Sequence, residues 1–218
     1  MNNLSQRIIT SVILLFVLSI SLLFNKYILL FGLILCSLVL FIEFNNLTKK
    51  IWKKNKSTLA RANIFSLVFL VIFIYVSYEF YKEPLLFLIL ICIFSDTGGY
   101  IVGNLIGGRK LTKISPKKTI SGSIGSFIFS LFPIVILWMY NNIFQENFRA
   151  DNYLKLIPVC LFLCLICQLG DLFISYFKRK ASVNDTGYIL PGHGGLLDRI
   201  DGVIFVVPTA YIINKIFF

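Results

Sequence analysis

Charged residues are scarce in this chain, since Asp, Glu, Lys and Arg make up only 14% of its 218 residues where a soluble domain has about 25%. A soluble globule needs a wetted polar surface, so this shortage excludes an ordinary water-soluble domain. Apolar residues make up 57% of the chain, the mean hydropathy is +0.84, and 22 Phe and 10 Tyr exclude a disordered chain. The composition therefore predicts a folded protein whose main solvent is lipid.

Zinc-binding and disulfide-forming cysteine patterns are also missing. The five cysteines all lie inside apolar runs: Cys36, Cys92, Cys160, Cys164 and Cys167. We interpret them as small hydrophobic residues rather than a disulfide framework. The last three share one helical face, but neither a fourth thiol nor the single histidine, His193, accompanies them, which argues against zinc. The spacing of a Walker A phosphate loop is absent as well.

Long apolar runs dominate what is present, and a helix needs about 20 residues to cross a bilayer. Seven candidate spans are predicted near residues 8–24, 27–44, 62–81, 85–106, 123–140, 153–173 and 202–218. The predicted fold is an all-α, polytopic integral membrane helix bundle of about seven transmembrane helices, forming a single membrane domain over residues 1–218. The first run lacks a small-residue cleavage site and is followed by another span, so no cleavable signal peptide is expected.

The basic residues predict the orientation of these spans. With the N-terminus inside, 16 of the 21 Lys and Arg residues fall on the inner side, most of them in three polar loops, and 5 fall outside. The positive-inside rule then places the three loops in the cytoplasm and the C-terminus outside. We expect a multi-pass protein of the inner cell membrane. The net charge of +11 suits an anionic membrane face or an anionic substrate.

The first segment that could carry chemistry is 95–122. It begins with Asp96, an ionisable group at the end of an apolar run, which is costly unless it faces water, a partner or a metal. Gly98, Gly99 and Gly103 would allow close helix approach, and Gly107 and Gly108 open a loop. Five cations follow, and the run Ser115, Pro116, Lys117, Lys118, Thr119 precedes the next helix. Such a helix start suits a polyphosphate, although glycine packing beside a basic topology loop explains the same pattern.

The second segment is 170–201. Four acids stand together there with cations and three glycines: Asp171, Asp185, Asp198 and Asp201; Lys178, Arg179 and Arg199; Gly192, Gly194 and Gly195, around His193. Asp198 and Asp201 are three residues apart, so on a helix they share a face and could bind one cation or bridge two. Oxygen ligands favour Mg²⁺ over zinc. The alternative is a set of surface salt bridges.

This second segment resembles the signature of the phosphatidate cytidylyltransferases, also called CDP-diacylglycerol synthases. The matching residues are Ser175, Phe177, Lys178, Arg179, Asp185, Gly187, Leu190, Pro191, His193, Gly194, Gly195, Leu196, Asp198, Arg199, Ile200 and Asp201. The upstream residues Asp96, Thr97, Gly98, Tyr100, Gly103 and 115–119 are similar to that family too, as are Arg7 and Glu43. Three positions depart from the pattern: Asn184 replaces a lysine, Ile174 an acid, and Ser121 a Glu or Gln.

The resemblance implies a transferase that joins CTP and phosphatidic acid into CDP-diacylglycerol and pyrophosphate. Our hypothesis assigns Asp171, Asp198 and Asp201 to a Mg²⁺ site, with a second cation left open. The other catalytic candidates are Lys178, Arg179 and His193. Nucleotide contacts are assigned to Asp96, Ser115, Lys117, Lys118, Thr119, Gly194, Gly195 and Arg199. Segments 95–122 and 170–201 would form a cytoplasm-facing active site.

Substrates and membrane lipids are the partners expected; nucleic acid is not, and homodimerisation is left open. Three alternatives remain at this stage: a degenerate homologue that binds CTP without turnover, a CTP-dependent polyprenol kinase, and a cation transporter that uses Asp96 and Asp171 as intramembrane ligands.

Overall fold

The computed structural model describes residues 25–139, 153–190 and 194–217. In these ranges the chain is helical, with isolated β-bridges and no longer strand. The chain divides into two compact units. Unit 1 comprises Met1–Lys82 and Ile174–Asp201, and unit 2 comprises Glu83–Phe173 and Gly202–Phe218. The predicted span at residues 8–24, and with it Arg7, lies outside the described residues.

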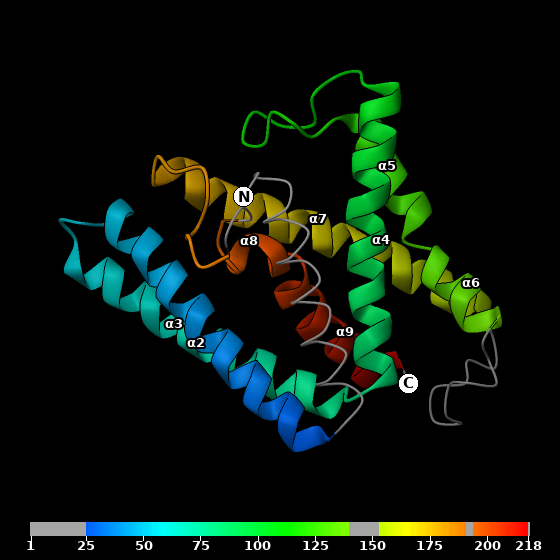
Figure 1. The fold of residues 1–218 in the computed structure, drawn as a ribbon, viewed down its shortest axis with the longest axis horizontal. Helices are drawn as coiled ribbons and strands as arrows, with labels where there is room; N and C mark the ends of the chain where they lie inside the picture. Colours follow the sequence, from blue (N-terminus) through cyan, green and yellow to red (C-terminus); the bar gives the residue numbers. More distant parts are fainter. Residues whose placement is uncertain (1–24, 140–152, 191–193, 218) are drawn as a thin grey trace, which may run out of the picture. The chain divides into compact units, whose positions relative to one another are not determined.

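Unit 1 is built on a hairpin of two long helices, α2 (Lys26–Ile51) and α3 (Lys56–Glu79), which run side by side (Figure 1). Each begins at an asparagine cap: the side chain of Asn25 accepts a hydrogen bond from the Tyr27 N–H, and that of Asn55 from the Thr58 N–H. The end of α7 and the short helix α8 (Leu197–Ile200) complete the described part of the unit.

The end of α7 packs on this hairpin through aromatic rings. The ring of Phe177 lies 5.4 Å from that of Phe44 and 6.1 Å from that of Trp52, centroid to centroid. Lys180 lies over the Trp52 ring at 5.5 Å, a cation–π contact. These contacts fix the α7 end, and with it Lys178 and Arg179, beside the α2–α3 turn.

Unit 2 contains the remaining helices. They are α4 (Glu83–Ile106), α5 (Ile120–Phe129), α6 (Phe132–Met139), the 3₁₀ turn η2 (Tyr153–Lys155), α7 (Leu156–Lys180, which continues into unit 1 from Ile174) and α9 (Val203–Phe217). Helices α4 and α5 lie side by side (Figure 1). A Cβ on Gly98 of α4 would lie 2.8 Å from the Gly125 carbonyl oxygen of α5, and a Cβ on Gly125 would lie 2.8 Å from the Gly98 carbonyl oxygen. The predicted close approach through small residues is confirmed for Gly98.

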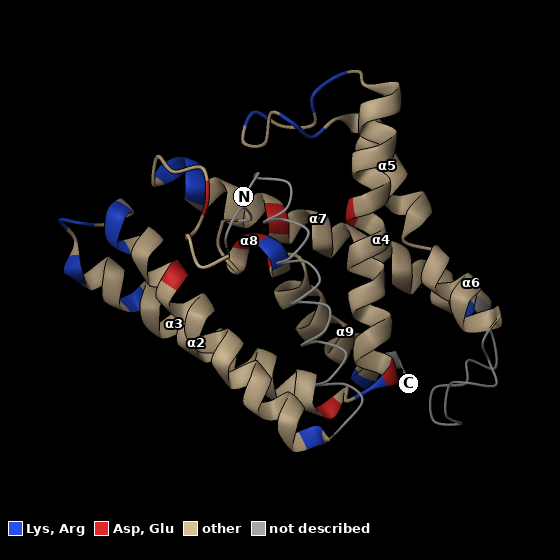
Figure 2. Cartoon of the chain, viewed as in Figure 1, with Lys and Arg blue, Asp and Glu red and all other residues tan. Residues whose placement is uncertain are grey.

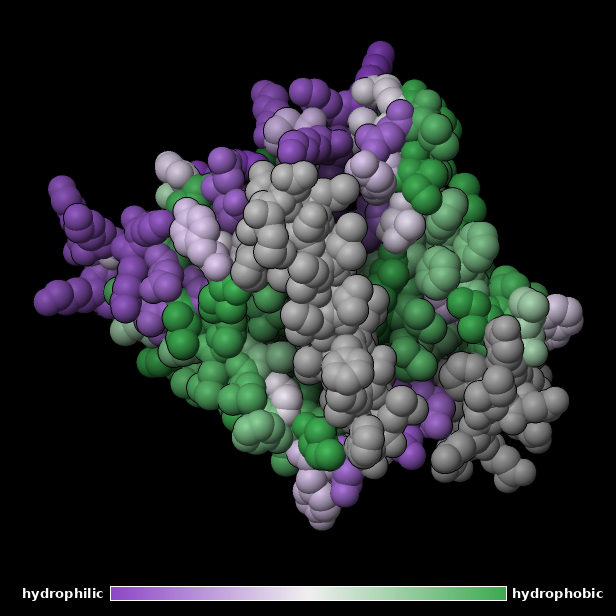
Figure 3. All heavy atoms as spheres, in the orientation of Figure 1, coloured by the Kyte–Doolittle hydropathy of each residue, from purple (hydrophilic) through white to green (hydrophobic). Residues whose placement is uncertain are grey.

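Five described segments are long and apolar enough to cross a membrane: Lys26–Ile51, Lys56–Glu79, Glu83–Ile106, Ile120–Met139 and Leu156–Lys180. Val203–Ile216 is a shorter apolar helix. Their outward faces are apolar: on the hairpin, hydrophobic side chains cover the helices and hydrophilic ones gather at the turn (Figure 3). The predicted all-α, multi-pass membrane architecture is confirmed. The single domain over 1–218 stays a prediction.

Candidate functional site

A cavity of about 530 Å³ in unit 2 is lined by several of the polar residues of segment 95–122. This volume falls within the ~300–1,000 Å³ of small-molecule sites. Its lining residues are Asp96, Gly99, Tyr100, Gly103, Asn104, Leu111, Ser115, Lys117, Lys118, Thr119, Gly122, Ser123, Ser126, Gln168 and Asp171. They come from α4, the loop after it, α5 and α7. Five predicted nucleotide-contacting residues (Asp96, Ser115, Lys117, Lys118 and Thr119) therefore share one pocket with Asp171.

The loop between α4 and α5 is held against this cavity by its own backbone. Gly107 and Gly108 open it with φ of 64° and 103°, values that favour glycine. The chain then folds back on itself: the Leu111 N–H donates to the Lys118 carbonyl at 2.8 Å, and the Lys118 N–H to the Ser115 carbonyl at 3.1 Å. Thr119 ends the loop by capping α5, because its hydroxyl accepts from the Gly122 N–H at 3.1 Å.

Charges of both signs meet inside the cavity. The ammonium of Lys118 forms an ion pair with the Asp171 carboxylate of α7, and Asp96 and Lys117 line the same pocket. The carboxylates of Asp96 and Asp171 offer oxygen atoms only, and oxygen donors suit a hard divalent cation. The ammonium groups suit phosphate oxygens. The cavity can therefore accommodate an anionic phosphate compound together with a cation.

Four polar residues of this cavity were missed by sequence reasoning: Asn104, Ser123, Ser126 and Gln168. Tyr100, which also lines it, was noted only as part of the resemblance. Gln168 is buried; its amide oxygen accepts from the Ser123 hydroxyl at 2.5 Å and its amide nitrogen donates to the Cys164 sulfur at 3.4 Å. A lone amide inside the apolar run 156–173 was the available signal. An interior position is costly for an amide unless it is hydrogen-bonded.

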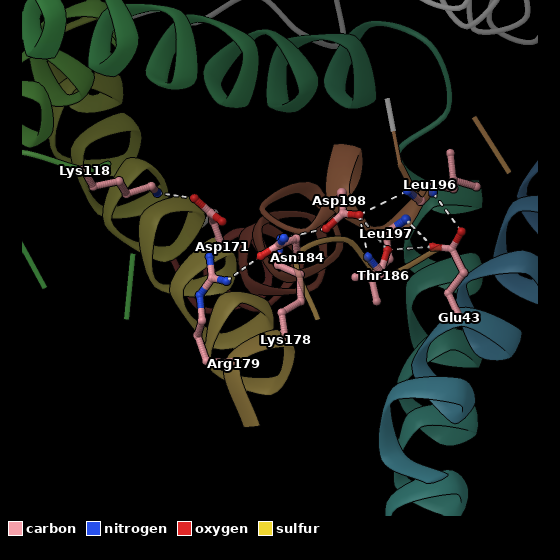
Figure 4. Close-up of polar contacts among 11 residues, drawn as sticks. Glu43, Lys118, Asp171, Lys178, Arg179, Asn184, Thr186, Leu196, Leu197 and Asp198 are labelled. Atoms are coloured by element: carbon pink, nitrogen blue, oxygen red, sulfur yellow. Dashed lines mark hydrogen bonds and ion pairs between the residues drawn. The ribbon is translucent and has the colours of Figure 1, made fainter. Parts of the chain in front are cut away.

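A second polar cluster lies in unit 1 and centres on Asp198 (Figure 4). Its Oδ2 accepts three hydrogen bonds, from the Thr186 N–H at 2.7 Å, the Thr186 hydroxyl at 2.9 Å and the Gly195 N–H at 3.1 Å. Its Oδ1 lies 2.7 Å from Nζ of Lys178, in an ion pair whose side chains are only 8% and 13% exposed. The structure thus brings Asp198 and Lys178 together, as two predicted catalytic residues.

Glu43, from α2, joins this cluster (Figure 4). It is 2% exposed, and its carboxylate accepts from the Leu196 N–H at 3.0 Å, the Leu197 N–H at 2.8 Å and the Thr186 hydroxyl at 3.1 Å. Glu43 was noted only as part of the resemblance, and Thr186 was missed. An acid inside an apolar run was the signal for Glu43. Its partners follow it by more than 140 residues, so no local pattern connects them.

The remaining predicted residues of the second segment take the following places. Arg179 donates to the Asn184 side-chain oxygen at 3.2 Å, and Arg199 is exposed on α8. Gly194 has a φ of 82°, and Gly195 is buried. Asp201 is buried directly after α8, in helical conformation three residues beyond Asp198. His193 lies outside the described residues.

No group of three His, Cys, Asp or Glu side chains suited to a metal occurs within residues 25–139, 153–190 and 194–217. Asp171 belongs to unit 2, and Asp198 and Asp201 belong to unit 1. A shared metal site of these three acids stays a prediction.

Comparison with known proteins identifies the family. The sequence is 42% identical over 123 residues to a phosphatidate cytidylyltransferase of Rickettsia bellii, a match of 56% of this chain and 53% of the relative. A protein of the same name from Staphylococcus haemolyticus is 47% identical over 131 residues, or 59% of this chain and 48% of the relative. The one from Rickettsia prowazekii is 42% identical over 120 residues, 55% and 53% respectively. The chain thus spans about half the length of these relatives.

The family model described as "Cytidylyltransferase family" matches residues 65–217, which include both polar clusters except for Glu43. The resemblance that the motifs indicated is confirmed, and the chain belongs to the cytidylyltransferase family.

Proposed function

We propose that this protein is a CTP:phosphatidate cytidylyltransferase, which makes CDP-diacylglycerol for phospholipid synthesis. The observation that carries the proposal is the cavity of unit 2, where Asp96 and Asp171 face the same space as Lys117 and Lys118. The names of the relatives supply the reaction. A membrane-embedded chain whose pocket fits a phosphate compound with a cation agrees with a soluble nucleotide meeting a lipid substrate.

The reaction asks for charge control rather than for a strong base. A phosphate oxygen of phosphatidic acid attacks the α-phosphorus of CTP, the bond from that phosphorus to the β-bridging oxygen breaks, and pyrophosphate leaves. The attacking phosphate is already anionic at neutral pH, so no serine nucleophile is needed. The barrier arises from the repulsion between two polyanions and from the charge that develops on the leaving group. Fixed cations lower both contributions.

The chain's own cations would perform this neutralisation. We assign Lys117 and Lys118 to the nucleotide phosphates, with Ser115 and Thr119 as hydroxyl contacts in the same pocket. Lys178 and Arg179 are assigned to phosphate groups in the second cluster. Gly194, Gly195, Arg199 and His193 are assigned to the nucleotide or the phosphates there, as the resemblance to the family signature implies.

Mg²⁺ is the cofactor we propose, and the two carboxylates that line the unit 2 cavity suit it. Asp96 and Asp171 supply carboxylates in one cavity, and Mg²⁺ in phosphate sites is typically held by one or two carboxylates plus substrate oxygens. Asp171, Asp198 and Asp201 are the proposed ligands, with Asp96 orienting metal or nucleotide. When bound, the ion would neutralise and orient the triphosphate. A second cation remains part of the proposal.

The three departures from the family pattern each find a place in the fold. Asn184 accepts a hydrogen bond from Arg179, so a guanidinium lies beside the position where a lysine is usual. Ser121 donates to the Gly107 carbonyl, which ties α5 to the start of the loop. Ile174 is 2% exposed, in keeping with an apolar side chain there. The fold therefore accommodates all three departures, and the transfer assay below distinguishes an active enzyme from a degenerate homologue.

The polar loops are proposed to face the cytoplasm, where CTP is available. In unit 1 the α2–α3 turn carries Lys53 and Lys54, and in unit 2 the α4–α5 loop carries Arg109, Lys110 and Lys113 (Figure 2). This distribution agrees with the positive-inside rule. The inner cell membrane is the location proposed.

The decisive test uses purified protein in mixed micelles with phosphatidic acid, Mg²⁺ and CTP labelled at the α-phosphate. Metal-dependent transfer of label into lipid, with one pyrophosphate released per lipid, would support the proposal. CTP binding without transfer would identify a degenerate homologue. CDP and a phosphorylated polyprenol, formed when that alcohol is supplied, would identify a kinase, and cation flux without CTP a transporter.

A further inference from the structure

The buried carboxylate of Glu43 organises a turn that lies far along the chain from it. Within the described residues, its three hydrogen-bond donors are neutral groups: two backbone N–H groups and the Thr186 hydroxyl. A carboxylate that is only 2% exposed is costly to bury, and the cost is offset when several donors converge on it. An apolar side chain would be the cheaper occupant of this position. Glu43 is therefore suited to specifying a conformation.

The space around Glu43 is shaped for a carboxylate. A Cβ on Gly187 would lie 2.5 Å from Oε1 of Glu43, and a Cβ on Gly195 would lie 2.6 Å from Oε2. Both glycines thus let the loop close directly on the acid. A side chain at either position would push the loop away from α2.

The Thr186 hydroxyl links Glu43 to Asp198. It lies 3.1 Å from Oε2 of Glu43 and 2.9 Å from Oδ2 of Asp198, and it has one hydrogen to donate between them (Figure 4). Consecutive backbone N–H groups are divided in the same way: that of Gly195 goes to Asp198, and those of Leu196 and Leu197 go to Glu43. The two carboxylates therefore clamp one turn from two sides.

This clamp, formed by Glu43 and Asp198 around residues 195–197, determines which carboxylate oxygen of Asp198 faces Lys178. The Thr186 N–H, the shared Thr186 hydroxyl and the Gly195 N–H lie on Oδ2, and Oδ1 lies 2.7 Å from Nζ of Lys178. We propose that Glu43 is a positioning residue for Asp198 and Lys178, acting through Thr186 and the 195–197 turn. Its effect on turnover rests on the proposed function; its effect on the turn does not.

The experiment compares Glu43→Gln and Thr186→Val with Thr48→Val in the full-length protein. In Glu43→Gln, one carboxylate oxygen is replaced by an amide nitrogen, which is a donor and cannot accept from the backbone N–H groups. Thr186→Val removes the hydroxyl that links Glu43 and Asp198, at nearly constant side-chain volume. Thr48 is the matched control because it is a fully buried polar residue of the same helix whose hydroxyl bonds within the α2–α3 hairpin, to the Asn45 carbonyl.

The first measurement does not depend on activity. Acylation of Lys178 by an amine reagent is followed by mass spectrometry, with Lys118 of unit 2 as the internal reference. We expect Lys178 to react about fivefold faster in Glu43→Gln and Thr186→Val, because loss of a hydrogen bond at the clamp loosens its partner Asp198. Thr48→Val should leave this rate unchanged.

The second measurement separates kcat from KM. Both clamp variants should lose kcat by about tenfold or more with KM for CTP nearly unchanged, since misplacing a site group affects the transition state. Thr48→Val should lower thermal stability alone. The kcat of the double variant should be no lower than that of Glu43→Gln, since both changes break the same connection between Glu43 and Asp198.

Two results would overturn the proposal: unchanged Lys178 acylation in folded Glu43→Gln, or clamp variants that lose only stability, as Thr48→Val does, with kcat retained. If Glu43→Gln fails to fold, Thr186→Val decides by the same criteria. If the wild-type protein transfers no cytidylyl group, the proposed function fails, and the acylation rates alone then decide whether Glu43 positions Asp198 and Lys178.

Discussion

At the scale of single residues, the described part of each unit holds a lysine–carboxylate pair in its polar cluster: Lys118 with Asp171 in unit 2, and Lys178 with Asp198 in unit 1. Neither pair is fully exposed, so each charge depends on its partner more than a surface pair would. Removal of one member deprives the other of an ion pair at a partly buried position. These pairs are therefore where substitutions should affect binding and turnover most.

Asp198→Asn should abolish turnover, with a loss of at least about 10² in kcat, because it removes the negative charge proposed to hold the cation and to pair with Lys178. The amide oxygen can still accept from the Thr186 and Gly195 N–H groups, so the protein should fold and remain in the membrane. Label transfer from CTP measures the rate, and thermal unfolding in detergent measures the fold.

Glu79→Gln serves as the control for that substitution, since it removes an exposed acid at the end of α3, remote in sequence from both clusters. It should transfer label at the wild-type rate. A folded Asp198→Asn protein with a near-normal rate would contradict the assignment of Asp198 to the site.

Lys118→Ala should raise KM for CTP by about 10- to 100-fold, which corresponds to the loss of one charge-assisted contact to phosphate. Lys113→Ala is its matched control, because Lys113 is exposed in the same loop but does not line the cavity. Equilibrium binding of labelled CTP distinguishes the two variants. Equal weakening by both would indicate that the loop contributes only a general positive field, and not a specific contact by Lys118.

At the scale of secondary-structure elements, the contact between α4 and α5 positions the cavity, since both helices and the loop between them line it. Gly125→Ala should destabilise the protein by about 1–3 kcal/mol. The new Cβ would lie 2.8 Å from the Gly98 carbonyl oxygen and 2.5 Å from Cβ of Val102, so the helices must separate. Thermal unfolding in detergent measures the effect.

Gly32→Ala on α2 is the appropriate comparison, because a Cβ there would meet nothing within 4 Å. Alanine favours the helix, so this variant should be neutral or more stable by less than about 1 kcal/mol. A Gly125→Ala protein as stable as Gly32→Ala would show that α4 and α5 do not need this close approach.

The helices themselves were largely predictable, because apolar runs of about 20 residues have few alternatives. Their ends were not. Helix α2 continues to Ile51 and α7 to Lys180, since lysines and arginines are favourable in a last turn and do not end a helix. The predicted span 123–140 is divided at Ser130 and Leu131 into α5 and α6. The Ser130 hydroxyl donates to the Phe127 carbonyl there, and Pro133 offers no N–H to continue the ladder.

The site was predictable where its residues are close in sequence. Ser115, Lys117, Lys118 and Thr119 were predicted together and lie together. The contacts of Glu43 and Gln168 were not predictable, because no spacing connects α2 with Thr186 or Gln168 with Ser123. Only the fold brings these residues into contact.

At the scale of the whole molecule, charge is concentrated at particular ends of the helices. In the α2–α3 hairpin, the turn end carries Lys49, Lys50, Lys53, Lys54 and Lys56, whereas Lys26 and Glu79 stand at the other end (Figure 2). Cations at the inner surface interact with anionic headgroups and resist translocation. The hairpin by itself therefore predicts its sidedness.

We expect a cysteine introduced at Lys54→Cys to react from the cytoplasmic side only, and one at Glu79→Cys from the outer side only. Both positions are exposed, and they lie at opposite ends of the hairpin. A membrane-impermeant thiol reagent, applied to intact cells and to inverted membrane vesicles, provides the measurement. The unsubstituted protein is the control: its cysteines are Cys36, partly exposed within α2, and the buried Cys92, Cys160, Cys164 and Cys167. Labelling of Lys54→Cys in intact cells would contradict the predicted orientation. It would place the basic turn on the outer face, away from CTP and against the positive-inside rule.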